Sequence, residues 1–209
     1  QRYFDLNALL EVQLKNKLSD DFVRWLMQPH RLGLLLYTLE KSDDRSRAFS
    51  LLESLYKHAP QACEAYYNLA VALVVVWDQP RQKVHAQAGG HELDFEEELE
   101  KRFDYFVELY KTEAKVNYED LSLQELIFVV DTPLPLAELQ WARKKVKLSL
   151  PYWRNIYAGI HYSRERLKSK KYQWEAGPYT LESIKKNGGI CVDQAYFLVM
   201  TARAWGIPA

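Results

Sequence analysis

The feature that most constrains this chain is a glycine pair, Gly188 and Gly189, followed by Cys191 and an uninterrupted helical run. No glycine or proline occurs from 192 to 205, and Gly206 and Pro208 then follow. Paired glycines permit a tight turn, and a glycine with a proline just beyond it is the typical end of a helix. The pattern therefore predicts a helix over 192–205 with Cys191 in its first turn.

The predicted helix is apolar on most of its surface, which indicates that it is buried on most sides. One stripe of the helix consists of Val192, Ala195, Tyr196, Val199 and Met200. At the start of such a helix, unpaired backbone N–H groups and the positive end of the helix dipole favour a thiolate over a thiol. Cys191 is therefore the candidate nucleophile, and the alternative is a cysteine that packs as a small apolar residue.

The sequence on both sides of Cys191 matches a more specific pattern than a helix with a cysteine at its start. Gly-Gly-Ile-Cys-Val-Asp-Gln-Ala over 188–195, with Ala-Trp-Gly-Ile-Pro-Ala over 204–209, resembles the nucleophile segment of the papain-like transglutaminase-like superfamily. Tyr-Thr-Leu-Glu-Ser-Ile over 179–184 is similar to the short helix that precedes the nucleophile in that family. The resemblance covers roughly the last quarter of the chain. It implies a cysteine hydrolase or acyltransferase that acts on amide bonds, with Cys191 as the nucleophile.

The resemblance also implies a second hydrogen-bond donor for the oxyanion, from the segment before the nucleophile. Tyr179 stands at that place, with Trp174 and Gln173 as further candidates. The alternative for Tyr179 is an aromatic ring packed against the central helix. Asp193 and Gln194 would cap free N–H groups or line the cleft, and neither is expected to be catalytic.

In the family, a histidine and an acidic residue follow the Gly-Ile-Pro segment on strands of a sheet, whereas this sequence ends at Ala209. We therefore expect the chain alone to lack amidase and crosslinking activity, and the natural product to continue past Ala209. The alternative is a helical scaffold or binding protein with a degenerate transglutaminase-like region. None of the histidines in the sequence stands at the position of the family's catalytic histidine. They are His30, His58, His85, His91 and His161.

Upstream of the resemblance, apolar residues recur at helical spacing, which predicts an all-helical domain over 1–131. Ser122 to Glu125 form a capping box before 126–130, a segment that reads as a short helix or as a strand. The two prolines of 131–135 require extended backbone, so the domain junction is placed there. Helices are expected over 2–18, 20–27, 31–40, 45–58, 61–77 and 94–113.

The remaining residues, 132–209, are predicted to be the N-terminal portion of the transglutaminase-like catalytic domain. Further helices are expected over 136–146, 163–171 and 181–186, and the basic residues of the first two are taken as solvated faces. The predicted fold class is thus mainly α, a helical domain followed by the first, helical part of an α+β domain. His85, His91 and Asp94 lie in or beside a loop without metal-ligand spacing, so no metal site is predicted.

Charge and composition exclude several partners. Lys and Arg number 28, as do Asp and Glu, so the net charge of +0 gives no reason to expect nucleic acid or an anionic membrane. The longest apolar run, 69–77, is too short to cross a bilayer. The expected partner is a protein or peptide substrate, and no cofactor is implied. Cys63 and Cys191 are expected to be free thiols, and a start at Gln1 is compatible with a removed export signal or a trimmed sequence.

Overall fold

The computed structural model describes residues 17–28, 30–79, 95–149, 151, 153–168 and 174–209. These residues are mainly helical, as predicted, and in this part of the chain the only β pairing is one isolated bridge. The predicted helix over 2–18 and the segment with His85, His91 and Asp94 lie outside the described residues. The helices are α2 (Asp20–Leu26), α3 (Arg31–Thr38), α4 (Arg45–His58), α5 (Pro60–Ala65), α6 (Tyr67–Val76), α7 (Phe95–Thr112), η1 (Tyr118–Asp120), α8 (Leu123–Val130), α9 (Leu136–Lys145), α10 (Arg154–Ala158), α11 (Arg164–Lys168), α12 (Leu181–Asn187) and α13 (Cys191–Ala204).

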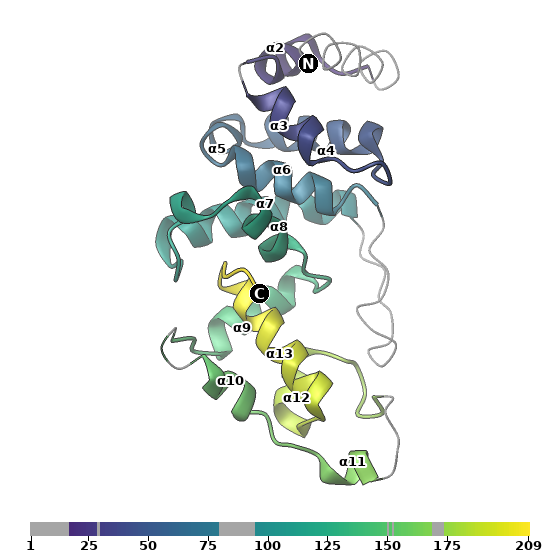
Figure 1. The fold of residues 1–209 in the computed structure, drawn as a ribbon, viewed down its shortest axis with the longest axis vertical. Coiled ribbons are helices and arrows are strands. Elements are labelled where there is room, and N and C mark those ends of the chain that lie inside the picture. Colours follow the sequence, from purple (N-terminus) through teal and green to yellow (C-terminus); the bar gives the residue numbers. More distant parts are fainter. Residues whose placement is uncertain (1–16, 29, 80–94, 150, 152, 169–173) are drawn as a thin grey trace. The chain divides into compact units, whose positions relative to one another are not determined.

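The chain forms two compact units, and neither is one continuous stretch. Among the described residues, unit 1 contains 17–28, 30–79, 95–107 and 122–130, and unit 2 contains 108–121, 131–149, 151, 153–168 and 174–209. The chain crosses from unit 1 to unit 2 for the last time between Val130 and Asp131, beside the predicted junction. The division at that junction into two domains stays a prediction. Figure 1 shows the elements of each unit in sequence colours.

Unit 1 is organised around α6, which packs against α4 and α8. Helix α6 is apolar on every side, and its residues from Leu69 to Val74 are all buried. Helix α4 begins at Asp44, whose side chain accepts a hydrogen bond from the Arg47 backbone N–H at 3.0 Å. That cap satisfies one of the donors left open at a helix start, and α4 begins at Arg45, the first residue of the predicted range 45–58.

Two sequence predictions in unit 1 were decided by the structure. The segment over 61–77 was predicted as one helix, which was wrong, because Tyr66, with φ −117° and ψ 41°, separates α5 from α6. The segment over 126–130 is a helix and not a strand. Its capping box forms as the sequence indicates, with Glu125 accepting from the Ser122 backbone at 2.8 Å. No described helix is long and apolar enough to cross a membrane.

Unit 2 is organised around α13, which packs against α9, α10 and α12. The helix ends as predicted, since Gly206 has a left-handed φ of 71° that glycine adopts at little cost. The Tyr110 hydroxyl donates to the Gly206 carbonyl at 3.0 Å, and the Trp205 indole donates to the Val146 carbonyl at 3.2 Å. These side chains fix the far end of α13, and the candidate site lies at its other end.

Candidate functional site

Cys191 is the first residue of α13, and its free thiol is exposed. The sequence predicted both the helix and this position. A backbone N–H at the first turn of a helix has no partner within the helix, so the start of α13 offers donors beside the sulfur atom. Position and exposure are the two observations on which the hypothesis of a nucleophile depends.

The turn before Cys191 is held by a neighbouring segment of the chain. The Gly189 N–H donates to the His161 carbonyl at 2.9 Å, and the Ser163 N–H donates to the Gly189 carbonyl at 2.9 Å. Together these bonds make a parallel bridge between Tyr162 and Gly189. The backbone two residues before the nucleophile is thus fixed by residues 161–163, a contact that the sequence did not predict.

The two glycines of this turn are required for different reasons. Gly188 has a left-handed φ of 73°, and a Cβ there would lie 2.3 Å from the His161 carbonyl oxygen. Gly189 has no such backbone constraint, but its Cβ would lie 2.4 Å from the Cβ of Asp193. At Gly188 the turn therefore packs against the backbone of His161, and at Gly189 it packs against the first turn of α13.

Asp193 is the centre of the site's polar contacts. It is fully buried, and its carboxylate accepts from the Ile190 backbone N–H at 2.8 Å and from the Tyr179 hydroxyl at 2.9 Å. The same carboxylate accepts from the guanidinium of Arg166 and forms an ion pair with it. A buried carboxylate is tolerated only when donors surround it, and here three donors do so. Asp193 thereby ties the start of α13 to two other segments.

Arg166 corrects one sequence prediction. The basic run over 163–171 was taken as a solvated face, but the Arg166 side chain is only 13% exposed. Its guanidinium lies 5.2 Å from the centre of the Trp174 ring. The cation is therefore placed between a carboxylate and an aromatic face, which compensates for its removal from water. No local sequence pattern distinguishes Arg166 from its basic neighbours, so sequence reasoning could not single it out.

Tyr179 packs against the central helix and also makes a polar contact. Its ring lies 5.2 Å from that of Tyr196 and 5.1 Å from that of Trp174. Burial and the nearby charge of Asp193 raise the pKa of the Tyr179 hydroxyl, so this group stays protonated and donates to Asp193. A role as oxyanion donor would require that bond to be exchanged. The indole N–H of Trp174 is buried and has no hydrogen-bond partner among the described residues.

Gln194 completes the anchoring of the helix start. Its side-chain amide donates to the Ile160 carbonyl at 2.8 Å, and the residue is buried. The sequence left open whether Asp193 and Gln194 cap free N–H groups or line a cleft. Asp193 caps the Ile190 N–H, whereas Gln194 bonds to the segment before the parallel bridge.

Two of the described histidines, His58 and His161, and the other cysteine are placed as follows. His58 lies in unit 1, with its ring 2.9 Å from a carboxylate oxygen of Asp104. His161 belongs to unit 2 and is exposed, and its backbone pairs with the turn before Cys191. The structure records no hydrogen bond between Cys191 and a histidine among the residues it describes. Cys63 is buried in α5, and burial raises the pKa of its thiol to about 12.

Within the described ranges, no group of three or more His, Cys, Asp or Glu side chains could hold a metal ion. Comparisons with protein-family models, curated proteins and solved structures found no match to this chain. The transglutaminase-like resemblance therefore stays a prediction from the sequence motif.

Proposed function

We propose that this chain carries the nucleophile of a transglutaminase-like cysteine hydrolase or acyltransferase that acts on amide bonds of proteins or peptides. The observation that carries the proposal is the exposed thiol of Cys191 at the first residue of the buried helix α13. The turn before it has no room for a side chain at Gly188 or Gly189. A fixed turn and an open helix start are what a cysteine nucleophile requires.

The chemistry follows from that placement. The thiolate of Cys191 attacks the amide carbonyl carbon, and a C–S bond forms while the carbonyl oxygen becomes an oxyanion. When the oxyanion collapses, the C–N bond breaks and the leaving amine must take up a proton, which in a cysteine–histidine pair comes from the imidazolium. Because no such pair is recorded among the described residues, the proposal assigns the nucleophile to this chain and not that proton donor. Water or a second amine then takes the acyl group from the thioester, which restores the thiol. Hydrolysis and transfer differ only in that last acceptor.

Two donors are proposed to stabilise the oxyanion. The backbone N–H of Cys191 is at the first helical position, where no intrahelical acceptor exists. The Trp174 indole N–H is buried without a partner among the described residues. A preorganised donor aimed at an oxyanion contributes roughly 10²–10³-fold to the rate of acyl transfer. Within the proposal, Asp193, Arg166 and Tyr179 are positioning residues that hold the turn and the helix start.

The test compares the two thiols of one molecule. We expect iodoacetamide to label Cys191 at least roughly tenfold faster than Cys63 in the folded protein, because an exposed thiol reacts where a buried one is inert. Peptide-resolved mass spectrometry after short labelling times measures both rates in one sample. Labelling in denaturant is the control and should bring the two rates together. Equal rates in the folded protein, or faster labelling of Cys63, would exclude Cys191 as the nucleophile.

A second candidate function is the helical scaffold or binding protein. The observation that favours it is the absence of a hydrogen bond between Cys191 and a histidine in the described part of the chain. Acylation by p-nitrophenyl acetate separates the two functions, because an activated ester needs a nucleophile and only weak acid–base help. An acylating site releases a burst of nitrophenolate that Cys191→Ala abolishes and Cys63→Ala preserves. A scaffold gives no burst above that of Cys191→Ala.

A further inference from the structure

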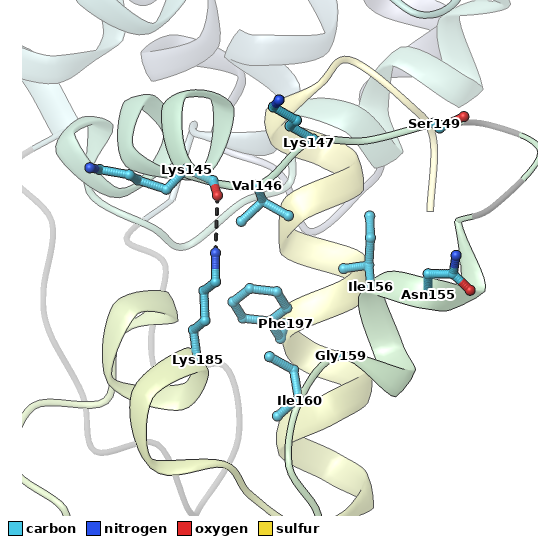
Figure 2. A pocket seen from close by; sticks show the side chains of 10 residues that line it. All are labelled: Lys145, Val146, Lys147, Ser149, Asn155, Ile156, Gly159, Ile160, Lys185 and Phe197. Atoms are coloured by element: carbon cyan, nitrogen blue, oxygen red, sulfur yellow. Dashed lines mark hydrogen bonds between the residues drawn. The ribbon is translucent and has the colours of Figure 1, made fainter.

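Unit 2 contains a pocket of about 440 Å³ that does not include Cys191 among its lining residues. It lies between the end of α9, the segment that follows α9, α10, α12 and the middle of α13 (Figure 2). The volume falls in the range of about 300–1,000 Å³ that is usual for small-molecule sites.

The floor of the pocket is apolar. Figure 2 shows the Phe197 ring of α13 near Val146, Ile156 and Ile160. All four residues are buried, so they form a packed wall and not a loose patch. A ligand on this floor would have to present an apolar group to the Phe197 ring.

The rim of the pocket is basic. Lys145, Lys147 and Lys185 line it and are exposed, and no Asp or Glu is among the described residues that line it. Three cations without a lining carboxylate attract an anion and disfavour a cation. The chain as a whole has a net charge of +0, so this local excess is a property of the pocket.

One of these lysines is held in place. The ammonium of Lys185 donates to the Lys145 carbonyl at 3.0 Å, the bond drawn as a dashed line in Figure 2. It also lies 5.9 Å from the centre of the Trp141 ring. An ammonium has three N–H donors, and one bond to a carbonyl leaves directions for an anion. Because Lys185 is positioned before a ligand arrives, binding loses less side-chain entropy there.

We propose that this pocket binds a small amphipathic carboxylate, with its apolar part on the Phe197 floor and its carboxylate at Lys185. The geometry joins a buried apolar wall to an anchored cation within one cavity, which is the arrangement such a ligand requires. The proposal is independent of the chemistry assigned to Cys191. Its failure would leave the proposed function unaffected.

The experiment is a calorimetric titration of the whole chain with octanoate, and with octanamide as a neutral analogue of the same length. We expect saturable binding of octanoate, and roughly tenfold weaker binding of octanamide, because the amide lacks the charge that strengthens a hydrogen bond to an ammonium. Equal binding of the two compounds, or no saturable binding of octanoate at millimolar concentration, would overturn the proposal.

Two matched lysines of α12 test the site. Lys185→Met should weaken octanoate binding roughly tenfold. Lys186→Met removes the same charge from the next residue, which is exposed and does not line the pocket, and should leave the affinity unchanged. Lys147→Met is a second lining variant, and it should weaken octanoate binding less than Lys185→Met because its ammonium points away from the Phe197 floor. Thermal unfolding confirms that each variant is folded, and equal loss in Lys185→Met and Lys186→Met would contradict binding in this pocket.

Discussion

The central helices of the two units are buried in different ways. The buried residues of α6 are all Leu, Ala or Val, whereas α13 buries Asp193, Gln194 and Thr201 among its apolar residues. An apolar helix can pack against any surface of suitable shape, but a buried polar group needs a partner in a defined direction. Helix α6 therefore contributes stability, while the first turn of α13 also fixes which segments lie beside it.

The two cysteines, one in each unit, differ in their exposure to solvent. Cys63 lies inside the helical packing of unit 1, and burial raises the pKa of its thiol to about 12. Cys191 is exposed, although the two residues that follow Val192 in the same helix are buried. Unit 2 thus exposes a thiol at the start of an otherwise buried helix, and its polar contacts hold that end in place.

The largest expected effect is that of Asp193→Ala. We expect it to destabilise unit 2 by about 3–5 kcal/mol, because it leaves the Arg166 guanidinium without its carboxylate and the Ile190 N–H without an acceptor. Hydrogen exchange of the α13 amides measures the loss. The α6 amides are the internal control and should keep their protection. Unchanged exchange in α13 would show that these contacts do not hold the helix start.

A smaller effect is expected from adding one methyl group at Gly189. Gly189→Ala would place its Cβ 2.4 Å from the Asp193 Cβ, so we expect a loss of about 1–3 kcal/mol from overpacking. Gly33→Ala in α3 is the matched control, because nothing lies within 4 Å of its added Cβ. That variant should gain about 0.5–1 kcal/mol, since alanine favours a helix interior over glycine. Thermal unfolding of the two variants should therefore shift in opposite directions.

The smallest expected effect on stability comes from two opposite substitutions, one that removes a buried hydroxyl and one that introduces a hydroxyl. The Thr201 hydroxyl is buried without a hydrogen-bond partner among the described residues, so Thr201→Val should be neutral or stabilise by up to about 1 kcal/mol. Val71→Thr places a hydroxyl in the apolar surroundings of α6 and should cost about 1 kcal/mol or more. Denaturant titration measures both. A large loss in Thr201→Val would indicate that this hydroxyl has a structural role like that of Asp193.

The sequence predicted the helices whose ends carry local signals. Helix α4 begins at a capping aspartate, and α13 lies between a glycine pair and Gly206, so both could be located from neighbouring residues. The break at Tyr66 could not, because neither glycine nor proline marks it. It shows only in the backbone angles of Tyr66, which leave the helical region.

The candidate site was predictable in its centre but not in its surroundings. Cys191 stands out because its motif is contiguous. Arg166 and Ile160, which contact α13 at Asp193 and Gln194, are 27 and 34 residues away in the chain and match no spacing rule. The pocket was not predicted for the same reason, since its lining comes from separate segments that only folding brings together.

The two glycines before Cys191 differ in whether a second substitution elsewhere could make their replacement tolerable. A side chain at Gly189 conflicts with the Asp193 side chain, and because the nearest atom is its Cβ, only glycine at 193 would remove that conflict. A side chain at Gly188 conflicts with the backbone carbonyl of His161 and requires a left-handed φ as well, and no substitution at 161 removes a carbonyl. Replacement of Gly189 is therefore conditional on a second site, whereas Gly188 has no compensating partner among the side chains. In genetic terms, the effect of replacing Gly189 depends on the residue at 193, which is epistasis. The effect of replacing Gly188 does not depend on the side chain at another position.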